Sequence, residues 1–285
     1  MIRSILFPVG DGAPVASARE FAFWLARSEN AHILALAVLD MKAFEIPVLG
    51  TPDGFMPTVV AAPIQETQTL LDEMTAAARE HLERFAAECS SREISCSVEV
   101  RTGLPGELLA REAIAHDLVV MSRTGYSRAA VSQVPVEPLV TQVIRGSIRP
   151  VLVAGKHFPP AGRVQNILVA FDGSSHASRA LAIAATISAR PGVRCTLATV
   201  TGSEEEGREL LAPAEAYLCH HGLSPERQIA LGSKPSEAIC SLVGTLGADL
   251  LVMGAYGHSP IREVLFGSTT EHVLRQCECT VVLQS

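Results

Sequence analysis

Three glycines follow one apolar run near the C-terminus, and their spacing suits the binding of an anion. The run DLLVM ends at Gly254, and Gly257 and Gly267 follow, the last joined to Ser268 and Thr269. Glycine lets a backbone approach a phosphate closely, and N–H groups at a helix start donate hydrogen bonds to it. The segment lacks the lysine of a P-loop and does not match the dinucleotide fingerprint. From these residues alone, phosphate binding and a purely structural turn both stay open.

The first half of the chain carries a weaker version of this segment. It reads DLVVMSRTGYS, with Ser122 in the place of Gly254, and Glu137 and Pro138 stand near the expected Gly-Ser pair. A carboxylate repels phosphate, and proline has no N–H to donate. We therefore expect one phosphate-binding site per chain, in the second half, with the first half serving as a scaffold.

The chain contains two copies of one plan. ILFPVGDG closes an apolar run on Asp11, ILVAFDGS closes one on Asp172, and an alanine-rich helical pattern follows each. Asp117 and Asp249 open the matching runs DLVVM and DLLVM. Continuous apolar runs that alternate with helical patterns are typical of a parallel sheet covered on both faces. The predicted fold class is α/β, with two tandem Rossmann-like domains, each a five-stranded parallel sheet with helices on both faces.

The boundary between the copies falls in GKHFPPAGRVQ, where prolines and glycines mark a short linker. We expect domains at residues 1–155 and 163–285. The last strand of each, PVLVA and TVVLQ, would lie at the edge of an open sheet, and exposed edges pair with other strands. We therefore expect an intramolecular pseudo-dimer through these two strands, and a homo-oligomer of such chains stays open.

The first copy also holds an extra segment, about residues 41–75, that has no counterpart of that length in the second copy. It leads into a pattern that predicts a long helix around residues 66–89. A surface elaboration, a lid and an interface are all open for this segment.

Composition argues against several classes of protein. The net charge is -7, and no cluster of lysines and arginines points to a nucleic-acid partner. No apolar run approaches the roughly 18 residues of a membrane span. Seven cysteines at irregular spacing suit neither a structural zinc site nor a redox pair. Because the N-terminus shows no signal-peptide pattern, we expect a cytoplasmic protein with free thiols and with neither a membrane nor a metal site.

Three motifs together resemble those of the universal stress protein family in its tandem form: ILVAFDGS, GSKPSEAI and GAYGHSPIREVLFGS. The resemblance covers essentially both halves, and the last motif is typical of the family's ATP-binding branch. It implies ATP in the C-terminal domain, with any Mg²⁺ bound through the phosphates. The residues that it implicates near the base are Ala170, Phe171 and Asp172, with Val200 beyond the second strand. Those that it implicates around ribose and phosphates are Met253, Gly254, Gly257, Gly267, Ser268 and Thr269.

The resemblance also implies a function. It points to a cytoplasmic stress-response or regulatory protein that binds an adenine nucleotide and acts through conformation or choice of partner. No nucleophile, base and orienting group can be assembled into a catalytic set from the sequence, so we expect at most slow ATP hydrolysis. The alternative is an ATP-hydrolysing or adenylate-forming enzyme of similar fold. A duplicated scaffold that binds nothing is a third interpretation.

Overall fold

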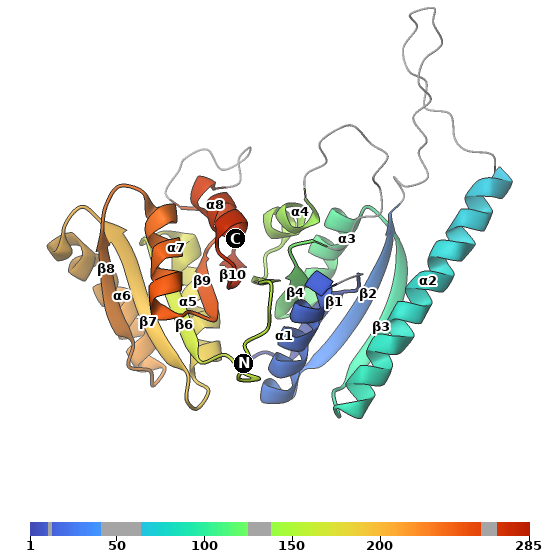
Figure 1. Ribbon diagram of the computed structural model, residues 1–285, viewed down its shortest axis with the longest axis horizontal. Coiled ribbons are helices and arrows are strands. Elements are labelled where there is room, and N and C mark those ends of the chain that lie inside the picture. Colours follow the sequence, from blue (N-terminus) through green and yellow to red (C-terminus); the bar gives the residue numbers. More distant parts are fainter. Residues whose placement is uncertain (11–12, 41–63, 125–137, 258–266) are drawn as a thin grey trace, which may run out of the picture.

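A single sheet with helices on both faces runs through the molecule (Figure 1). The computed structural model describes residues 1–10, 13–40, 64–124, 138–257 and 267–285. The elements of the first half are β1 (Ser4–Pro8), α1 (Ala13–Glu29), β2 (His32–Asp40), α2 (Ile64–Ser91), β3 (Cys96–Gly103), α3 (Pro105–Glu112), the 3₁₀ turn η2 (Ala113–Ala115), β4 (Leu118–Ser122), α4 (Leu139–Gly146) and β5 (Val151–Ala154). Those of the second half are β6 (Asn166–Ala170), α5 (Ser175–Ser188), β7 (Arg194–Thr201), α6 (Glu204–His220), β8 (Glu226–Leu231), α7 (Pro235–Leu246), β9 (Leu250–Gly254), α8 (Ser268–Gln276) and β10 (Thr280–Gln284).

The strands follow the order β3-β2-β1-β4-β5-β10-β9-β6-β7-β8. All pairs within each half are parallel, and the pair between β5 and β10 is antiparallel. The predicted α/β class, with five parallel strands in each half, is therefore confirmed. The predicted pairing of the last strands is also confirmed, because Val282 lies opposite Leu152 and Val281 opposite Val153. The two sheets thus form one.

The duplication is visible in how each half anchors its first strand. Asp117 accepts hydrogen bonds from the backbone amides of residues 3 and 4, at 2.7 and 3.1 Å. Asp249 does the same for residues 165 and 166, at 2.7 and 2.9 Å. Each carboxylate satisfies amides at the amino end of a strand that have no partner in the ladder. The matched aspartates of the two copies therefore perform one structural task.

The apolar core forms two layers, one on each face of the sheet. Residues of α1, α2, α5 and α6 pack with one layer, and residues of α3, α4, α7 and α8 pack with the other. The alanine-rich pattern of α5 has a packing reason, since Ala180 and Ala184 are fully buried against the strands. Ser174 caps this helix by accepting a hydrogen bond from the Ala177 amide at 3.1 Å. Small side chains let the helix lie close to the sheet.

The extra segment of the first half falls mostly outside the described residues. The long helix that it leads into is present as α2, which begins at Ile64 and ends at Ser91. Residues 41–63 lie outside the described part of the chain, so the choice between a surface elaboration, a lid and an interface stays a prediction. Among the helices described, none has the length and apolar character needed to cross a bilayer.

The cysteines differ from expectation. Cys240 in α7 and Cys277 just after α8 form a disulfide, with their Cα atoms 5.6 Å apart. The expectation that all the thiols are free is therefore wrong for this pair. The two residues are 37 positions apart in the chain, and they meet only because α7 and α8 pack side by side. Spacing along the sequence carries no signal of that contact.

The strand pairing between the halves predicts a large effect of a buried charge at its centre. Val282 is fully buried, so Val282→Lys would place an ammonium in the apolar core next to β5. We expect the free energy of unfolding to fall by about 3 kcal/mol or more. Urea denaturation measures this, with Gln228→Lys on the exposed side of β8 as the control. A loss under about 1 kcal/mol for Val282→Lys would contradict a buried seam.

Candidate functional site

The strand order reverses between β6 and β9 in the second half. From β6 the chain continues to its neighbour β7 on one side, and from β9 it continues to β10 on the other. Ala170 at the end of β6 lies opposite Met253 near the end of β9. Open α/β sheets bind ligands beyond the carboxyl ends of strands at such a reversal. The glycine segment after β9 begins at this point.

Two loops meet at the reversal. Asp172, in the loop after β6, accepts a hydrogen bond from the Ser174 amide at 2.9 Å, which holds its carboxylate over the start of α5. The Ser174 hydroxyl lies 3.5 Å from the carbonyl oxygen of Tyr256 in the loop after β9. A Cβ atom added to Gly257 would lie 3.0 Å from Oδ2 of Asp172. A side chain at Gly257 would therefore press on the Asp172 carboxylate, because the two loops approach each other closely.

Gly254 has a different reason to be glycine. A Cβ atom there would lie 2.7 Å from the Ala177 nitrogen and 2.9 Å from the carbonyl carbon of His176, in the first turn of α5. The end of β9 packs directly against that turn. In the first half, Ser122 is accommodated at the matching position, and its hydroxyl donates to the carbonyl oxygen of Thr124. Packing against α5 thus explains why residue 254 is glycine.

Helix α8 begins beside the same loops. Its first residue is Ser268, and no side chain caps its N-terminus at Gly267. The hydroxyl of Thr270 donates to the carbonyl oxygen of Ala255 at 2.8 Å, which ties the first turn of α8 to the end of β9. Ser268 is exposed. An uncapped helix start offers N–H groups and a positive dipole end to an anion.

The structure brings most of the predicted site residues together. Residues 170–172 end β6, residues 253–257 end β9 and begin the following loop, and residues 267–269 open α8. Val200 lies on β7, the strand next to β6, where it pairs with Ala230 of β8. Residues 258–266, which include His258, lie outside the described part of the chain. None of the predicted residues in the described part is a lysine or arginine, so backbone amides are the donors available from this set.

Sequence reasoning missed several residues around this point. Tyr256 contacts His176, with ring centroids 5.4 Å apart. Thr270 anchors α8, although only its two predecessors had been singled out. Ser174 caps α5 and also lies against the loop after β9. The motif GSTT contained the signal for Thr270, whereas nothing in the sequence links His176 to Tyr256.

The far end of α8 is held by a residue of the other half. Arg123, just after β4, donates from one guanidinium nitrogen to the Leu274 carbonyl at 2.6 Å and from another to the Cys279 carbonyl at 2.7 Å. Burial lowers the pKa of Arg123, and the guanidinium stays protonated because its ordinary pKa is so high. Cations near the C-terminus of a helix stabilise it by satisfying its last carbonyls. Arg123 therefore couples the first half to the helix that opens at the candidate site.

The disulfide lies at the same end of α8. Cys277 directly follows the helix, and its bond to Cys240 ties that end to α7. Nearby, burial raises the pKa of the Cys279 thiol to about 11, so this thiol stays protonated at neutral pH. A protonated thiol is a poor nucleophile.

Removal of the Arg123 guanidinium should weaken the contact between the first half and the C-terminal end of α8. We expect Arg123→Ala to lower the free energy of unfolding by about 2 kcal/mol or more, because two charge-assisted hydrogen bonds are lost. Urea denaturation measures the change. Arg111→Ala, which removes an exposed arginine from the last turn of α3, is the control and should have little effect. Equal losses in the two variants would contradict a specific role for Arg123.

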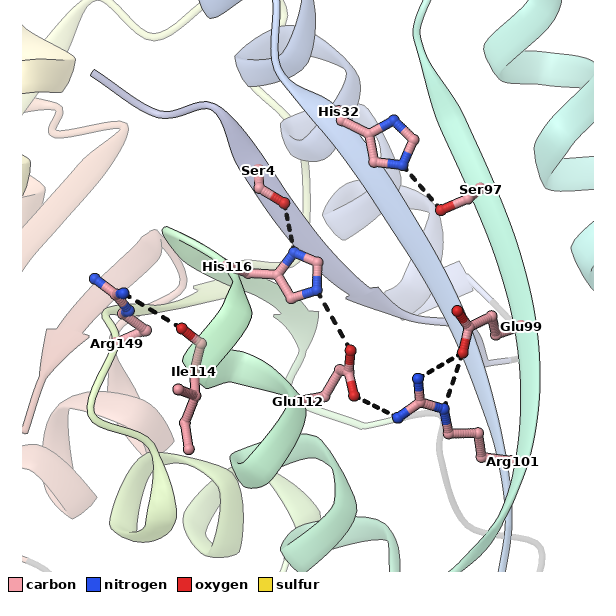
Figure 2. Close-up of polar contacts among 9 residues, drawn as sticks. All are labelled: Ser4, His32, Ser97, Glu99, Arg101, Glu112, Ile114, His116 and Arg149. Atoms are coloured by element: carbon pink, nitrogen blue, oxygen red, sulfur yellow. Dashed lines mark hydrogen bonds and ion pairs between the residues drawn. The ribbon is translucent and has the colours of Figure 1, made fainter.

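A second polar cluster lies in the first half and extends from the amino ends of β1 and β4 along α3 to the middle of β3 (Figure 2). His116 is buried, and its Nδ1 lies 2.5 Å from the hydroxyl oxygen of Ser4. Its Nε2 faces Glu112, whose carboxylate pairs with Arg101, and Arg101 also binds Glu99 at 2.6 Å (Figure 2). The cluster thus joins β1, α3 and β3.

The cluster contains serine, histidine and glutamate but does not have the geometry of a catalytic triad. Nε2 of His116 lies 3.8 Å from the Glu112 carboxylate, which is beyond hydrogen-bond distance. A triad needs the acid to orient the imidazole through a hydrogen bond while the other nitrogen meets the nucleophile. His116 and Ser4 also lie at the amino ends of β4 and β1, opposite the edge where such sheets bind ligands. Its role is structural.

The buried imidazole predicts a dependence of stability on pH. Burial lowers the pKa of His116 from 6.5, His32 lowers it further, and Glu112 and Asp117 raise it in part. The unfolded chain therefore takes up this proton at a higher pH than the folded protein does. Stability should fall as the pH drops below 6.5 and level off once the folded imidazole is protonated.

The variant that tests this is His116→Asn, which removes the titrating group. We expect the difference in unfolding free energy between about pH 7.5 and about pH 5.5 to shrink in this variant. His157→Asn, at an exposed position of the linker, is the control. If both variants keep the pH dependence of the parent protein, His116 is not its source.

With the fold and the site in place, comparison with known proteins defines the class. Two doubly wound halves that share one sheet describe a tandem Rossmann-like protein. The model of the universal stress protein family matches residues 1–155 and again residues 163–284. The chain therefore belongs to the universal stress protein family, in a tandem form.

Individual relatives agree with this assignment. The universal stress protein Slr1230 of Synechocystis sp. is 27% identical over 278 residues, which cover 92% of each chain. A universal stress protein of Thermus aquaticus is 29% identical over 133 residues, which cover 42% of this chain and 97% of that one. Among solved structures, a universal stress protein from Archaeoglobus fulgidus has a TM-score of 0.74 at 21% identity and covers 99% of this chain and 98% of that chain. That last similarity is one of fold.

Proposed function

We propose that this protein is a cytoplasmic stress-response or regulatory protein that binds ATP in its second half. The observation that carries the proposal is the meeting of an uncapped helix start, at Gly267, with the Asp172 and Tyr256 loops at the strand reversal. This meeting is the arrangement in which backbone amides bind phosphate without lysine. The glycine pattern of the ATP-binding branch coincides with it.

The residues present fit an adenine nucleotide. Ala170, Asp172 and the backbone of Phe171 would face the base, with Val200 on the adjoining strand, whereas the Phe171 side chain is buried in the core. The backbone at Met253 and Gly254, the close-approach position Gly257, and the helix start at Gly267, Ser268 and Thr269 would meet ribose and phosphates. An added Cβ atom at Gly267 would lie 3.2 Å from the Ala255 carbonyl oxygen and 3.6 Å from Oγ1 of Thr270, so even a small side chain there would crowd the junction between α8 and the end of β9. Mg²⁺, when bound, would be held through the phosphates, which supply the charge it needs.

We further propose that residues 163–285 form the ATP-binding domain and residues 1–155 a domain that has lost this site. Two observations support this division. Ser122 stands where Gly254 allows close packing in the second half. The neighbouring Arg123 is committed to α8 of the other half rather than to a ligand. On this proposal ATP acts as a regulatory ligand, and turnover, if any, is slow.

The proposal predicts one nucleotide per chain and a specific effect at Gly267. We expect Gly267→Glu to abolish ATP binding in a folded protein, because the carboxylate fills the phosphate space and repels phosphate. Gly267→Ala adds the Cβ atom without the charge and should weaken binding less. Isothermal titration calorimetry measures stoichiometry and affinity, and circular dichroism confirms the fold.

Two results would contradict the proposal. The first is a stoichiometry of two equivalent sites, which would give the first half a site of its own. The second is an unchanged affinity in folded Gly267→Glu, which would place the phosphates elsewhere. The titration should be run with and without dithiothreitol, because a reducing compartment keeps most thiols reduced and the Cys240–Cys277 bond ties α7 to the end of α8. A steady-state release of phosphate well above that of Gly267→Glu would favour the enzyme alternative.

A further inference from the structure

A cavity of about 360 Å³ opens at the opposite edge of the first half. It is lined by Phe23, Trp24, Arg27, Ser28, Arg92 and Gly162. The first four belong to the last turns of α1, Arg92 directly follows α2, and Gly162 belongs to the linker between the halves. Helix α1 ends where β2 begins, and the linker leads into β6 (Figure 1). The lining residues therefore place the cavity at the amino ends of the strands. It is therefore separate from the proposed ATP site.

The cavity combines aromatic rings with guanidinium groups. The Arg92 guanidinium lies over the Phe23 ring, 4.7 Å from its centroid, and that of Arg190 lies over the Trp24 ring at 4.9 Å. Phe23 is buried, whereas Trp24 is half-buried and presents part of its ring to solvent. Rings and guanidinium planes of this kind offer flat surfaces on which another planar group can stack.

The charges around the cavity do not balance. Arg92 pairs with Glu20 at 3.0 Å, and Arg190 pairs with Glu29 at 2.8 Å. Arg27, which is exposed, has no ion-pair partner among the described residues. An arginine in the last turn of a helix interacts favourably with the helix dipole. That interaction does not account for the aromatic cavity beside Arg27. The free guanidinium leaves a net positive charge at the mouth of a partly apolar cavity.

From this combination we propose that the cavity is a binding site for a small planar anion, an aromatic or heteroaromatic ring that carries a carboxylate or phosphate. The ring packs against the exposed part of Trp24, and the anionic group meets Arg27 and the accessible edge of Arg92. The volume suits a small molecule of this size. Because Gly162 lines the cavity, a bound ligand also contacts the linker that joins the two halves.

Trp24 makes the proposal directly measurable, since it is the one tryptophan of the chain. We expect phenyl phosphate to cause a saturable change in tryptophan fluorescence at concentrations up to about 10 mM. Benzyl alcohol lacks the anion and inorganic phosphate lacks the ring, so each should bind at least about tenfold more weakly. The experiment uses the full chain.

Matched arginine variants locate the anion. Arg27→Gln should weaken the binding of phenyl phosphate by about tenfold, because a charge-assisted contact is lost. Arg79→Gln, at an exposed position of α2, should leave it unchanged. The proposal is overturned if phenyl phosphate causes no saturable change, if benzyl alcohol binds as well as phenyl phosphate, or if the two variants behave alike.

The test is independent of the ATP proposal. Gly267→Glu, which removes the proposed ATP site, should still show the full response of Trp24 to phenyl phosphate. A response lost in Gly267→Glu but kept in Arg27→Gln would assign the effect to the ATP site and overturn the cavity as its source.

Discussion

Three residue pairs between β5 and β10, with Val282 and Leu152 at the centre, join two five-stranded sheets into one. The seam depends on close backbone approach at its end. A Cβ atom on Gly155 would lie 2.2 Å from the carbonyl oxygen of Glu278, and the Gly155 amide instead donates to the Thr280 hydroxyl at 2.9 Å. Pairing removes the exposed edge that each half would otherwise present. Because the edges meet within one chain, the halves stay in register with each other.

That register brings the two halves into contact through α8. The helix opens at Gly267, beside the proposed phosphate position, and ends against Arg123 of the first half and the disulfide of Cys277. A short helix held at its C-terminal end presents its N-terminal amides in a fixed place. Backbone donors bind an anion best when they need no rearrangement. The first half therefore contributes to the candidate site without providing a ligand residue to it.

The two halves share the aspartates that hold their first strands, and they differ elsewhere. Asp117 and Asp249 hold the first strand of each half in the same way. At the carboxyl ends, the second half has Gly254 and Ala255 where the first has Ser122 and Arg123. At the amino ends, the first half has a buried histidine, His116, and a cationic aromatic cavity. The two edges of the sheet thus offer different chemistry in the two halves.

Local sequence patterns determined the two copies, the parallel strands, the edge pairing and the glycine segment, because buried parallel strands and turns leave periodic and compositional signals in adjacent residues. The sequence singled out Gly254 and Gly257 as candidate site residues. Their neighbours, the first turn of α5 beside Gly254 and the Asp172 carboxylate beside Gly257, came from the structure. The contacts of Arg123 with α8 and the Cys240–Cys277 disulfide were decided by tertiary structure alone. They join elements far apart in the chain, and such contacts depend on how helices pack over a sheet rather than on any spacing along the sequence.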